Sequence, residues 1–291
     1  MLTTSIGLQQ KFTSPAEGLK ESVLLNNSVR MPWLGLGVWQ AGDDTETENA
    51  VKTALQQGYR SIDTASIYGN ERGVGRGLRE SGVPREEIFV TTKVWNDAVR
   101  DHGVESAFEQ SLKRLQLDYV DLYLVHWPIV GEIEAAWHSM ERISRSGRAK
   151  AIGVCNHLIP HLDELLRSAE VFPAVNQIEF HPYLQSEPLL EYCQGKKIQV
   201  EAWSPLMQGG AVLRDPVITD IARVHGKSTA QVILRWIVQR GIVTIPKSTR
   251  LERIVENSEI FDFVLTDAQM SAIGARNRGH RVGPDPLHFN F

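Results

Sequence analysis

The segment GYRSIDTASIYGNE, residues 58–71, shows how this chain folds and where its chemistry lies. Apolar and polar residues alternate after Gly58, which predicts a short strand that ends at Asp63. A loop containing Tyr68 follows, and Glu71 opens a predicted helix. Catalytic groups lie at the carboxyl ends of strands in chains built from strand–helix units, so a carboxylate and a phenol at this point suggest acid–base chemistry. A loop whose polar groups are simply satisfied is the alternative.

The same strand-then-helix unit recurs along the chain. A hairpin is expected at 22–31, before the first unit, because two short apolar runs flank a pair of asparagines. Strands are predicted at 34–39, 60–63, 88–93, 120–126, 149–154, 174–179, 198–202 and 242–245. Helices are predicted at 43–57, with Asp43 as N-cap, and at 70–80, 104–115, 133–145, 161–170, 186–194, 216–225, 228–239, 250–257 and 266–275.

Eight such units over about 250 residues predict an α/β fold, a closed (β/α)8 TIM barrel with an N-terminal β-hairpin and extra C-terminal helices. An open doubly wound sheet is the rival, but it would usually carry G-x-G-x-x-G after its first strand. The closest match, GVGRG at 73–77, has the wrong spacing and lies inside a predicted helix. One domain is expected over 22–291, with 1–21 as a poorly ordered leader, and the hairpin could cover the N-terminal end of the barrel.

Composition excludes several classes of function. The chain has 291 residues, 42% hydrophobic and 23% charged, with a net charge of −4. This charge gives no reason to expect nucleic acid or an anionic membrane as a partner, and no apolar run reaches membrane-spanning length. Two cysteines, Cys155 and Cys193, fit a reducing compartment, and the N-terminus lacks a secretion pattern. We therefore expect a cytoplasmic protein, acting as a monomer on a small molecule.

Four polar side chains are expected at one mouth of this barrel. Asp63 ends the second strand, Tyr68 lies just beyond it, Lys93 ends the third strand and His126 ends the fourth. A buried ammonium is costly without a partner, and Asp63 is the natural one for Lys93. Taken alone, His126 would read as a hydrogen-bonded core histidine. The convergence of all four groups at one barrel end favours a site.

Several sequence motifs occur in an order known from one protein family, which the chain matches from about Val23 to the C-terminus. They are GYRSIDTA at 58–65, TTKVW at 91–95, LVHWP at 124–128, VNQIEFHP at 175–182 and IPKS at 245–248. In these motifs the chain resembles the aldo-keto reductases. It is most similar to their compact, largely microbial branch, which includes 2,5-diketo-gluconate reductase, glyoxal reductase and prostaglandin F synthase-like enzymes. The resemblance implies NADPH-dependent reduction of aldehydes and small ketones or dicarbonyls to alcohols.

The resemblance also implies a catalytic tetrad of Asp63, Tyr68, Lys93 and His126. Tyr68 would donate a proton to the carbonyl oxygen while the nicotinamide supplies hydride to the carbon. A phenol with a pKa near 10 is a poor acid at neutral pH, so the Lys93 ammonium is expected to lower the pKa of Tyr68. Asp63 would hold Lys93 in place, and a neutral His126 would orient the carbonyl.

The cofactor residues follow from the same resemblance. Asn156 and Gln177 would bind the nicotinamide carboxamide, and Trp203 would stack on the nicotinamide ring. Ser204 and Leu206 would contact the pyrophosphate. The 2′-phosphate would be bound by Lys247, Ser248 and Arg253, and the adenine would lie near Glu256 and Asn257. The lysine–serine pair after the last strand also suits the phosphate site that such barrels share, although a solvated basic helix start is the alternative. Cys155 stands where the family commonly has serine, which weakens a possible contact to the carboxamide.

The resemblance assigns the substrate pocket to Trp39, Trp95, Trp127 and His126. Few residues separate Pro128 from the next predicted helix, so the long loop that narrows the pocket in larger relatives is absent. We therefore expect an open site with loose selectivity. The tail VGPDPLHFNF, residues 282–291, could fold over this mouth.

Two other functions remain open at this point. Glu179 and Glu201 end the sixth and seventh strands, and such a pair could be the acid and the nucleophile of a barrel hydrolase. A nucleotide-sensing binding subunit with little turnover is the other alternative. No metal site is expected, because His157 and His161 lack a third ligand in a recognisable pattern.

Overall fold

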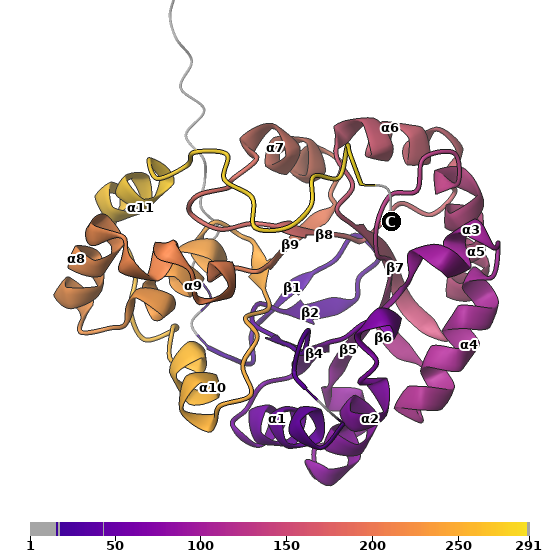
Figure 1. The fold of residues 1–291 in the computed structure, drawn as a ribbon, viewed down its shortest axis with the longest axis horizontal. Coiled ribbons are helices and arrows are strands. Elements are labelled where there is room, and N and C mark those ends of the chain that lie inside the picture. The colour runs from indigo at the N-terminus through magenta and orange to yellow at the C-terminus, as the bar shows by residue number, and fades with distance from the viewer. Residues whose placement is uncertain (1–15, 17, 43, 290–291) are drawn as a thin grey trace, which may run out of the picture.

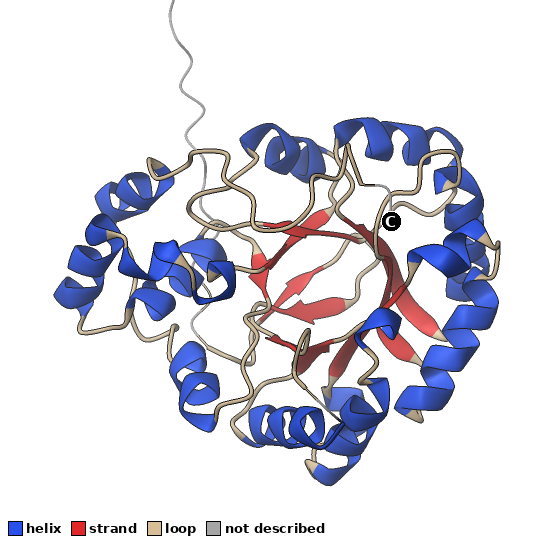
Figure 2. Ribbon diagram, in the orientation of Figure 1, coloured by secondary structure: helices blue, strands red, loops and turns tan. Residues whose placement is uncertain are grey.

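The computed structural model describes residues 16, 18–42 and 44–289. Its centre is a parallel sheet of eight strands that curls into a barrel ringed by helices (Figure 2). Neighbouring strands follow chain order around the barrel: β3 (Leu36–Gly37), β4 (Ser61–Asp63), β5 (Phe89–Val94), β6 (Val120–Val125), β7 (Ala149–Cys155), β8 (Val175–Glu179), β9 (Gln199–Trp203) and β10 (Val243–Thr244). The predicted (β/α)8 fold is confirmed.

The barrel closes between its first and last strands. Parallel bridges join Leu34 to Thr244 and Gly37 to Lys247. The Gly37 N–H donates to the Pro246 carbonyl at 3.2 Å, and a Cβ on Gly37 would lie 2.9 Å from the Ile245 carbonyl oxygen. Only glycine permits this approach, so the seam of the barrel depends on Gly37.

The helices lie around the outside of the barrel (Figure 1). They are α1 (Asp44–Gln56), α2 (Glu71–Glu80), α3 (Asn96–Arg100), α4 (Val104–Leu115), α5 (Ile133–Arg145), α6 (Ile159–Ser168), α7 (Glu187–Gly195), α8 (Pro216–His225), α9 (Thr229–Gln239), α10 (Leu251–Ser258) and α11 (Asp267–Gly274). None of the helices in the described part of the chain is long and apolar enough to cross a membrane.

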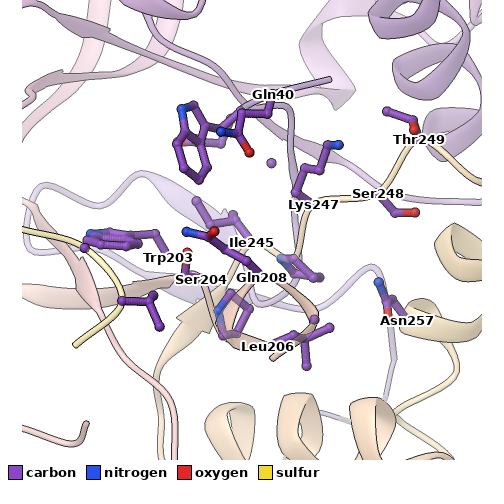
Figure 3. Close-up of a pocket in the computed structure, with 18 of the residues that line it drawn as sticks. Gln40, Trp203, Ser204, Leu206, Gln208, Ile245, Lys247, Ser248, Thr249 and Asn257 are labelled. Atoms are coloured by element: carbon purple, nitrogen blue, oxygen red, sulfur yellow. The ribbon is translucent and has the colours of Figure 1, made fainter. Parts of the chain in front are cut away.

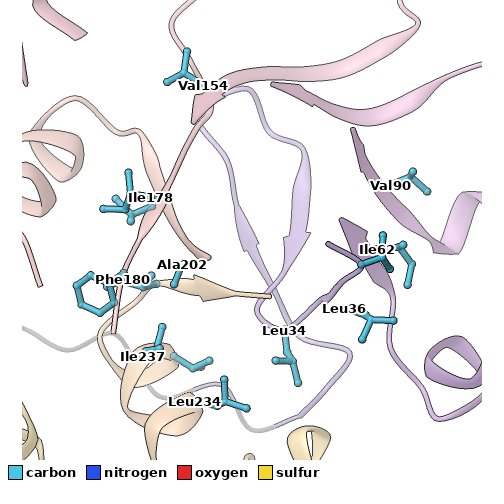
Figure 4. Packing of buried hydrophobic residues seen from close by; sticks show 14 of the residues in the cluster. Leu34, Leu36, Ile62, Val90, Val154, Ile178, Phe180, Ala202, Leu234 and Ile237 are labelled. Carbon is cyan, nitrogen blue, oxygen red and sulfur yellow. The ribbon is translucent and has the colours of Figure 1, made fainter. Parts of the chain in front are cut away.

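Apolar side chains pack in two layers. The outer layer lies between strands and helices, where Ile178 and Ala202 of the barrel meet Leu234 and Ile237 of α9 (Figure 4). The inner layer lies inside the barrel and includes Leu122, Leu124, Ala151, Val175 and Val243. Because the strands are covered on both faces, strands such as β5, β6 and β8 are buried along their whole length, polar residues included.

The N-terminal hairpin closes one end of the barrel, as expected. Its strands, β1 (Ser22–Leu24) and β2 (Arg30–Pro32), pair in antiparallel fashion. Leu25 and Met31 pack into the inner layer, while the Asn26 and Asn27 amides donate to the carbonyls of Pro173 and Lys150, near the N-terminal ends of β8 and β7. The polar mouth therefore lies at the opposite end.

The GVGRG run inside α2 serves helix packing. A Cβ on Gly73 would lie 2.4 Å from the Asp44 carbonyl of α1, and one on Gly75 would lie 2.1 Å from the Leu115 carbonyl of α4. A Cβ on Gly77 would lie 2.7 Å from the Glu48 carbonyl of α1. These glycines let α2 approach both neighbours closely, which explains the glycine-rich run by helix packing alone.

Most predicted elements lie within two residues of the observed ones. The first strand is shorter than predicted, since only 36–37 pair as a strand and Leu34 forms a separate bridge. Helix α3 and four 3-10 turns, η1 (Ser66–Tyr68), η2 (Arg85–Glu87), η3 (Met207–Gly209) and η4 (Ala211–Arg214), were not anticipated. Asp43, the proposed N-cap, lies outside the described residues, as does the leader over 1–15 and residue 17.

Candidate active site

The four residues of the predicted tetrad lie at the carboxyl ends of neighbouring strands. Asp63 is the last residue of β4, Lys93 lies near the end of β5, and His126 follows β6. The Lys93 ammonium donates to Asp63 Oδ1 at 2.6 Å and to the Thr64 carbonyl at 2.8 Å. It also lies 5.2 Å from the ring centroid of Tyr68, which ends η1.

A network of hydrogen bonds holds the loop that carries Tyr68. The Ser66 hydroxyl donates to the Lys93 carbonyl at 2.9 Å. The Thr64 hydroxyl donates to the Asn70 side chain, whose amide donates in turn to the Val38 carbonyl. The small residues after β4 thus tie the loop to β5 and to the end of the first strand, and Tyr68 projects into the mouth.

Lys93 keeps its charge although it has no exposed surface. Burial alone would lower the pKa of Lys93, but Asp63, together with Tyr68 and Cys155, raises it above its ordinary value. Burial raises the pKa of Asp63, and the Lys93 ammonium opposes that rise. The expected Lys93–Asp63 pair is present.

The pKa of Tyr68 differs from the sequence-based expectation. Burial raises the pKa of the Tyr68 phenol, and the nearby Lys93 ammonium opposes only part of that rise. The expected effect of Lys93 has the correct sign, but the net shift is upward because desolvation of a phenolate outweighs one neighbouring cation. At neutral pH the phenol therefore carries the proton that a general acid donates.

His126 packs edge-on against two aromatic rings. Its ring centroid lies 5.7 Å from that of Tyr68 and 5.2 Å from that of Trp95. Burial, and then the Lys93 charge, lowers the pKa of His126 well below its ordinary value, so the imidazole is neutral. Its Nδ1 atom is buried and has no hydrogen-bond partner among the described residues.

Gln177 of β8 connects the tetrad to a further carboxyl. Its Nε2 atom donates to Asp63 Oδ2 at 2.8 Å and to Glu201 Oε2 at 2.7 Å. Its Oε1 atom receives a long contact of 3.8 Å from the Cys155 thiol. Burial, and then repulsion by Asp63, raises the pKa of Glu201 to about 8.

Asn156 and Ser204 adopt left-handed backbone conformations at the ends of β7 and β9. Their φ angles are 60° and 49°, which are uncommon for residues other than glycine and cluster at functional sites. The Asn156 amide donates to the His126 carbonyl at 3.0 Å, and its oxygen accepts from the Trp203 indole at 2.9 Å. The turn after β7 thereby places Trp203 beside the tetrad.

A single cavity of about 1100 Å³ brings the predicted site residues together. Figure 3 shows Trp203 toward one side of the view and Ser248, Thr249 and Asn257 toward the other, with Leu206 and Gln208 between them. All predicted catalytic, cofactor and substrate residues line it except Lys93, which lies buried beneath Tyr68. A cavity of this volume has room for a dinucleotide and a small substrate together.

The end of the cavity away from Tyr68 and His126 is cationic. Lys247, Arg250 and Arg253 are exposed there, and none of them forms an ion pair with a described residue. Ser248 is buried, and its hydroxyl accepts from the Arg250 N–H at 3.1 Å. Three cations without an ion-pair partner in the described part of the chain, beside a structured turn, suit a phosphate group.

The near end of the cavity is aromatic. Trp39, Trp95 and Trp127 line it, as predicted, together with Ile67. Trp127 stacks on Phe289 of the C-terminal tail, with ring centroids 4.0 Å apart. The tail crosses the barrel mouth (Figure 1), and its segment 282–284 lines the cavity.

The carboxylates of the hydrolase alternative are already engaged. Glu179 Oε1 accepts from His181 at 2.9 Å and from the Val282 N–H at 2.6 Å, and Oε2 accepts from the Gly283 N–H at 3.1 Å. Glu179 therefore anchors the tail, and Glu201 faces Gln177 inside the barrel. Neither glutamate lines the cavity, so this pair does not flank a substrate bound there.

The two histidines considered for a metal site have structural partners. His157 contacts the Cys155 carbonyl at 2.8 Å, and His161 accepts from the Leu158 N–H at 3.2 Å. No group of three potential metal ligands occurs in the part of the chain that the structure describes.

Sequence reasoning missed several residues that line the cavity. Among them are Gln40, Ile67, Gln208, Thr249, Arg250 and the start of α9 at 228–230, whereas the tail at 282–284 was expected near the mouth. One signal was available for the helix start, because Ser228 and Gln231 form a capping box that marks an exposed helix N-terminus. Gln208 comes from an irregular segment whose course has no local sequence signature.

Comparison with known proteins agrees with this geometry. The model of the aldo/keto reductase family matches residues 33–278. The chain is 54% identical over 276 residues to glyoxal reductase of Bacillus subtilis (strain 168), covering 94% of this chain and 99% of that protein. It is 48% identical over 271 residues to methylglyoxal reductase DkgA of Escherichia coli (strain K12), covering 92% and 97%.

Solved structures show the same fold. An aldo-keto reductase from a Medee basin deep-sea metagenome library superposes with a TM-score of 0.90 at 43% identity, covering 93% of this chain and 100% of that one. A Bombyx mori aldo-keto reductase in complex with NADP superposes with a TM-score of 0.86 at 36% identity, covering 92% and 96%.

Proposed function

Because the chain belongs to the aldo/keto reductase family and is an NADPH-dependent oxidoreductase, we propose that it reduces small α-dicarbonyl compounds, with Tyr68 as the proton donor. One observation carries this proposal. Tyr68 and His126 lie on the wall of a cavity, with Lys93 beneath Tyr68, and the opposite end of this cavity holds three cations that form no ion pair with a described residue.

The proposed chemistry uses the groups in the positions described above. The hydride for the carbonyl carbon would come from NADPH when it is bound. Tyr68 transfers its phenolic proton to the carbonyl oxygen, so the substrate gains hydride and proton and leaves as an alcohol. Lys93 stabilises the phenolate left on Tyr68, and Asp63 holds Lys93 within 2.6 Å. Neutral His126 orients the carbonyl by a hydrogen bond.

The proposed cofactor site runs along the cavity from Trp203 to Asn257. Asn156 and Gln177 lie where a carboxamide would meet amide groups beside the Trp203 ring. Ser204 and Leu206 flank the middle of the cavity, and Lys247, Ser248 and Arg253 would bind the 2′-phosphate. Glu256 and Asn257 lie beyond them, where the adenine would fit. The free cations at that end support NADPH over NADH.

The substrate class follows from the shape of the mouth. Only residues 126–132 connect β6 to α5, so no long loop covers the aromatic walls formed by Trp39, Trp95 and Trp127. Two relatives that match over nearly the whole chain are named for glyoxal and methylglyoxal. A small dicarbonyl has an electrophilic carbonyl that needs little binding energy from a tight pocket.

The test is a panel of glyoxal, methylglyoxal, simple aldehydes and keto-sugars, scored by loss of NADPH absorbance. We expect the highest kcat/KM with the dicarbonyls. A keto-sugar or a bulky aldehyde turned over tenfold better would overturn the substrate class and leave the reductase assignment intact.

We also propose that the enzyme acts as a monomer in the cytoplasm. Both cysteines are free and buried, which suits a reducing compartment. Light scattering coupled to size exclusion tests the first part, and a mass near 65 kDa, twice that of the 32.6 kDa chain, would contradict it.

A further inference from the structure

Glu201 is a buried carboxyl for which the proposed reaction has no use. It lies in the middle of β9 with no exposed surface. Its Oε2 atom accepts from Gln177 Nε2 at 2.7 Å, while its Oε1 atom has no hydrogen-bond partner among the described residues. A fully buried carboxyl costs stability, so its retention beneath the site calls for a role.

The contact with Glu201 restricts what Gln177 can offer to a ligand. A side-chain amide has two N–H donors, and those of Gln177 are directed to Asp63 and Glu201. The remaining atom, Oε1, receives only a thiol at 3.8 Å, which is a weak donor. Gln177 therefore presents a carbonyl oxygen, suited to accept from the NH2 group of a carboxamide.

We propose that Glu201 is a positioning residue for the nicotinamide. Glu201 holds Gln177 so that the side-chain oxygen of Gln177 faces the carboxamide. Ionisation of Glu201 shifts the balance between bound NADPH and bound NADP+. The inference rests on the proposed placement of the nicotinamide between Gln177 and Trp203. It adds to that placement a residue which does not line the cavity itself.

The charged and titratable groups around Glu201 come from three strands. Asp63 of β4 faces it through Gln177, Lys93 of β5 lies behind Asp63, and Cys155 of β7 lies beside Gln177. The Lys93 pKa is raised, and burial raises the pKa of the Cys155 thiol well above its ordinary value. Burial also raises the pKa of Asp63, but the Lys93 ammonium at 2.6 Å holds Asp63 as a carboxylate, so Glu201, with a pKa of about 8, is the group expected to titrate between pH 7 and 9.5.

Ionisation of Glu201 places a negative charge on the barrel side of Gln177. The oxidised nicotinamide ring carries a positive charge and the reduced ring does not, so this charge favours NADP+. The ratio of the NADP+ Kd to the NADPH Kd should fall as pH rises from 7 to 9.5. A unit charge acting over about 10 Å at an effective dielectric constant of about 20 corresponds to roughly a tenfold fall.

The first test compares the wild type with Glu201→Gln, which keeps an acceptor for Gln177 and cannot ionise. Both dissociation constants are measured by quenching of tryptophan fluorescence at several pH values. The wild-type ratio should fall roughly tenfold, whereas the ratio in Glu201→Gln should stay flat. Glu141→Gln, which alters a buried carboxylate on α5 outside the site, should behave as the wild type. The same pH dependence in Glu201→Gln and wild type would overturn the charge part of the proposal.

The second test is a double-mutant cycle with Gln177→Met, read out as NADPH affinity. Glu201→Leu removes the acceptor and should weaken NADPH binding about five- to tenfold in the wild-type background. In the Gln177→Met background, Glu201→Leu should cause no further loss of NADPH affinity. An equal loss in both backgrounds would show that Glu201 does not act through Gln177 and would overturn the proposal. Unchanged affinity in Gln177→Met alone would instead remove the cofactor placement on which the proposal rests.

Discussion

The Lys93 ammonium lies 2.6 Å from the Asp63 carboxylate, and both side chains are enclosed by the barrel. The pair joins β4 to β5 directly beneath Tyr68, so it serves both the stability of the fold and the proposed proton transfer. These two effects can be separated by experiment.

Lys93→Met should lower both stability and turnover. Removing one partner of a buried pair leaves Asp63 uncompensated, which typically costs about 3–5 kcal/mol in the free energy of unfolding. Arg76→Met, which removes surface ion pairs with Glu48 and Asp44, should cost far less stability and leave kcat unchanged. Urea denaturation and steady-state kinetics provide the two readouts. A Lys93→Met enzyme with wild-type kcat would assign this lysine to the fold alone.

Tyr68→Phe should remove most turnover and leave the NADPH Kd nearly unchanged. The ring and its contacts with His126 remain, and only the proton donor is lost. General acid catalysis typically contributes roughly 10²–10⁴-fold to the rate. The matched control is Tyr59→Phe, which removes a buried hydroxyl bonded to the Ile254 carbonyl and should affect stability but not kcat. Near-normal kcat in Tyr68→Phe would refute the mechanism.

Arg253→Ala should weaken NADPH binding about ten- to a hundredfold and hardly change NADH binding. A hydrogen bond to a charged group contributes about 1.5–3 kcal/mol, and NADH lacks the 2′-phosphate. Fluorescence quenching gives both constants. Arg223→Ala, an exposed arginine on α8 paired with Asp220, should change neither. If the two cofactors lose affinity equally, Arg253 supports the fold or the adenine and the phosphate assignment is wrong.

Glu201 should make the apoenzyme less stable as pH rises from about 4.5 to 8. In this window the folded state keeps the Glu201 proton while the unfolded state releases it, because the pKa is raised from 4.5 to about 8. Since the folded state binds more protons, the free energy of unfolding falls with pH. Each pKa unit corresponds to about 1.4 kcal/mol, so the loss amounts to a few kcal/mol.

The measurement is the difference in unfolding free energy between Glu201→Gln and wild type at pH 5 and pH 8.5. The variant should gain relative stability at the higher pH, because glutamine has no proton to lose. A difference that does not change with pH would mean that Glu201 ionises in the folded state as readily as in the unfolded one.

Gly283→Ala should raise the KM for the carbonyl substrate by displacing the tail. A Cβ at this position would lie 2.4 Å from the Trp203 indole and 3.3 Å from Glu179 Oε2. The tail must then move away from the cavity, and the two N–H contacts that Glu179 accepts should weaken. Gly274→Ala at the end of α11 is the control, since its Cβ would meet only Gln185 at 3.9 Å. Equal KM values in both variants would show that the tail does not shape the pocket.

Local sequence patterns predicted most of the helices and strands. Helices α4 and α5 match their predicted ranges of 104–115 and 133–145, because their apolar residues recur at helical spacing. The order of strand–helix units was sufficient to place Asp63, Lys93 and His126 at one barrel end, since parallel strands present their carboxyl ends together. Short features without such periodicity, such as α3 and the turn at 207–209, could not be predicted.

The sequence by itself determined the barrel, the four groups at its mouth and the cationic segment after β10. Only the tertiary structure decided what those groups do to one another. The Gln177–Asp63 contact joins residues 114 positions apart, and the Glu179 contact with the tail joins residues 103 positions apart. Of the two glutamates that could have formed a hydrolase site, Glu179 binds the tail and Glu201 binds Gln177. The pKa of Tyr68 is raised, although the nearby Lys93 alone would have lowered it. Burial and the distances between charges set both outcomes, and these depend on through-space contacts that have no local signature in the chain.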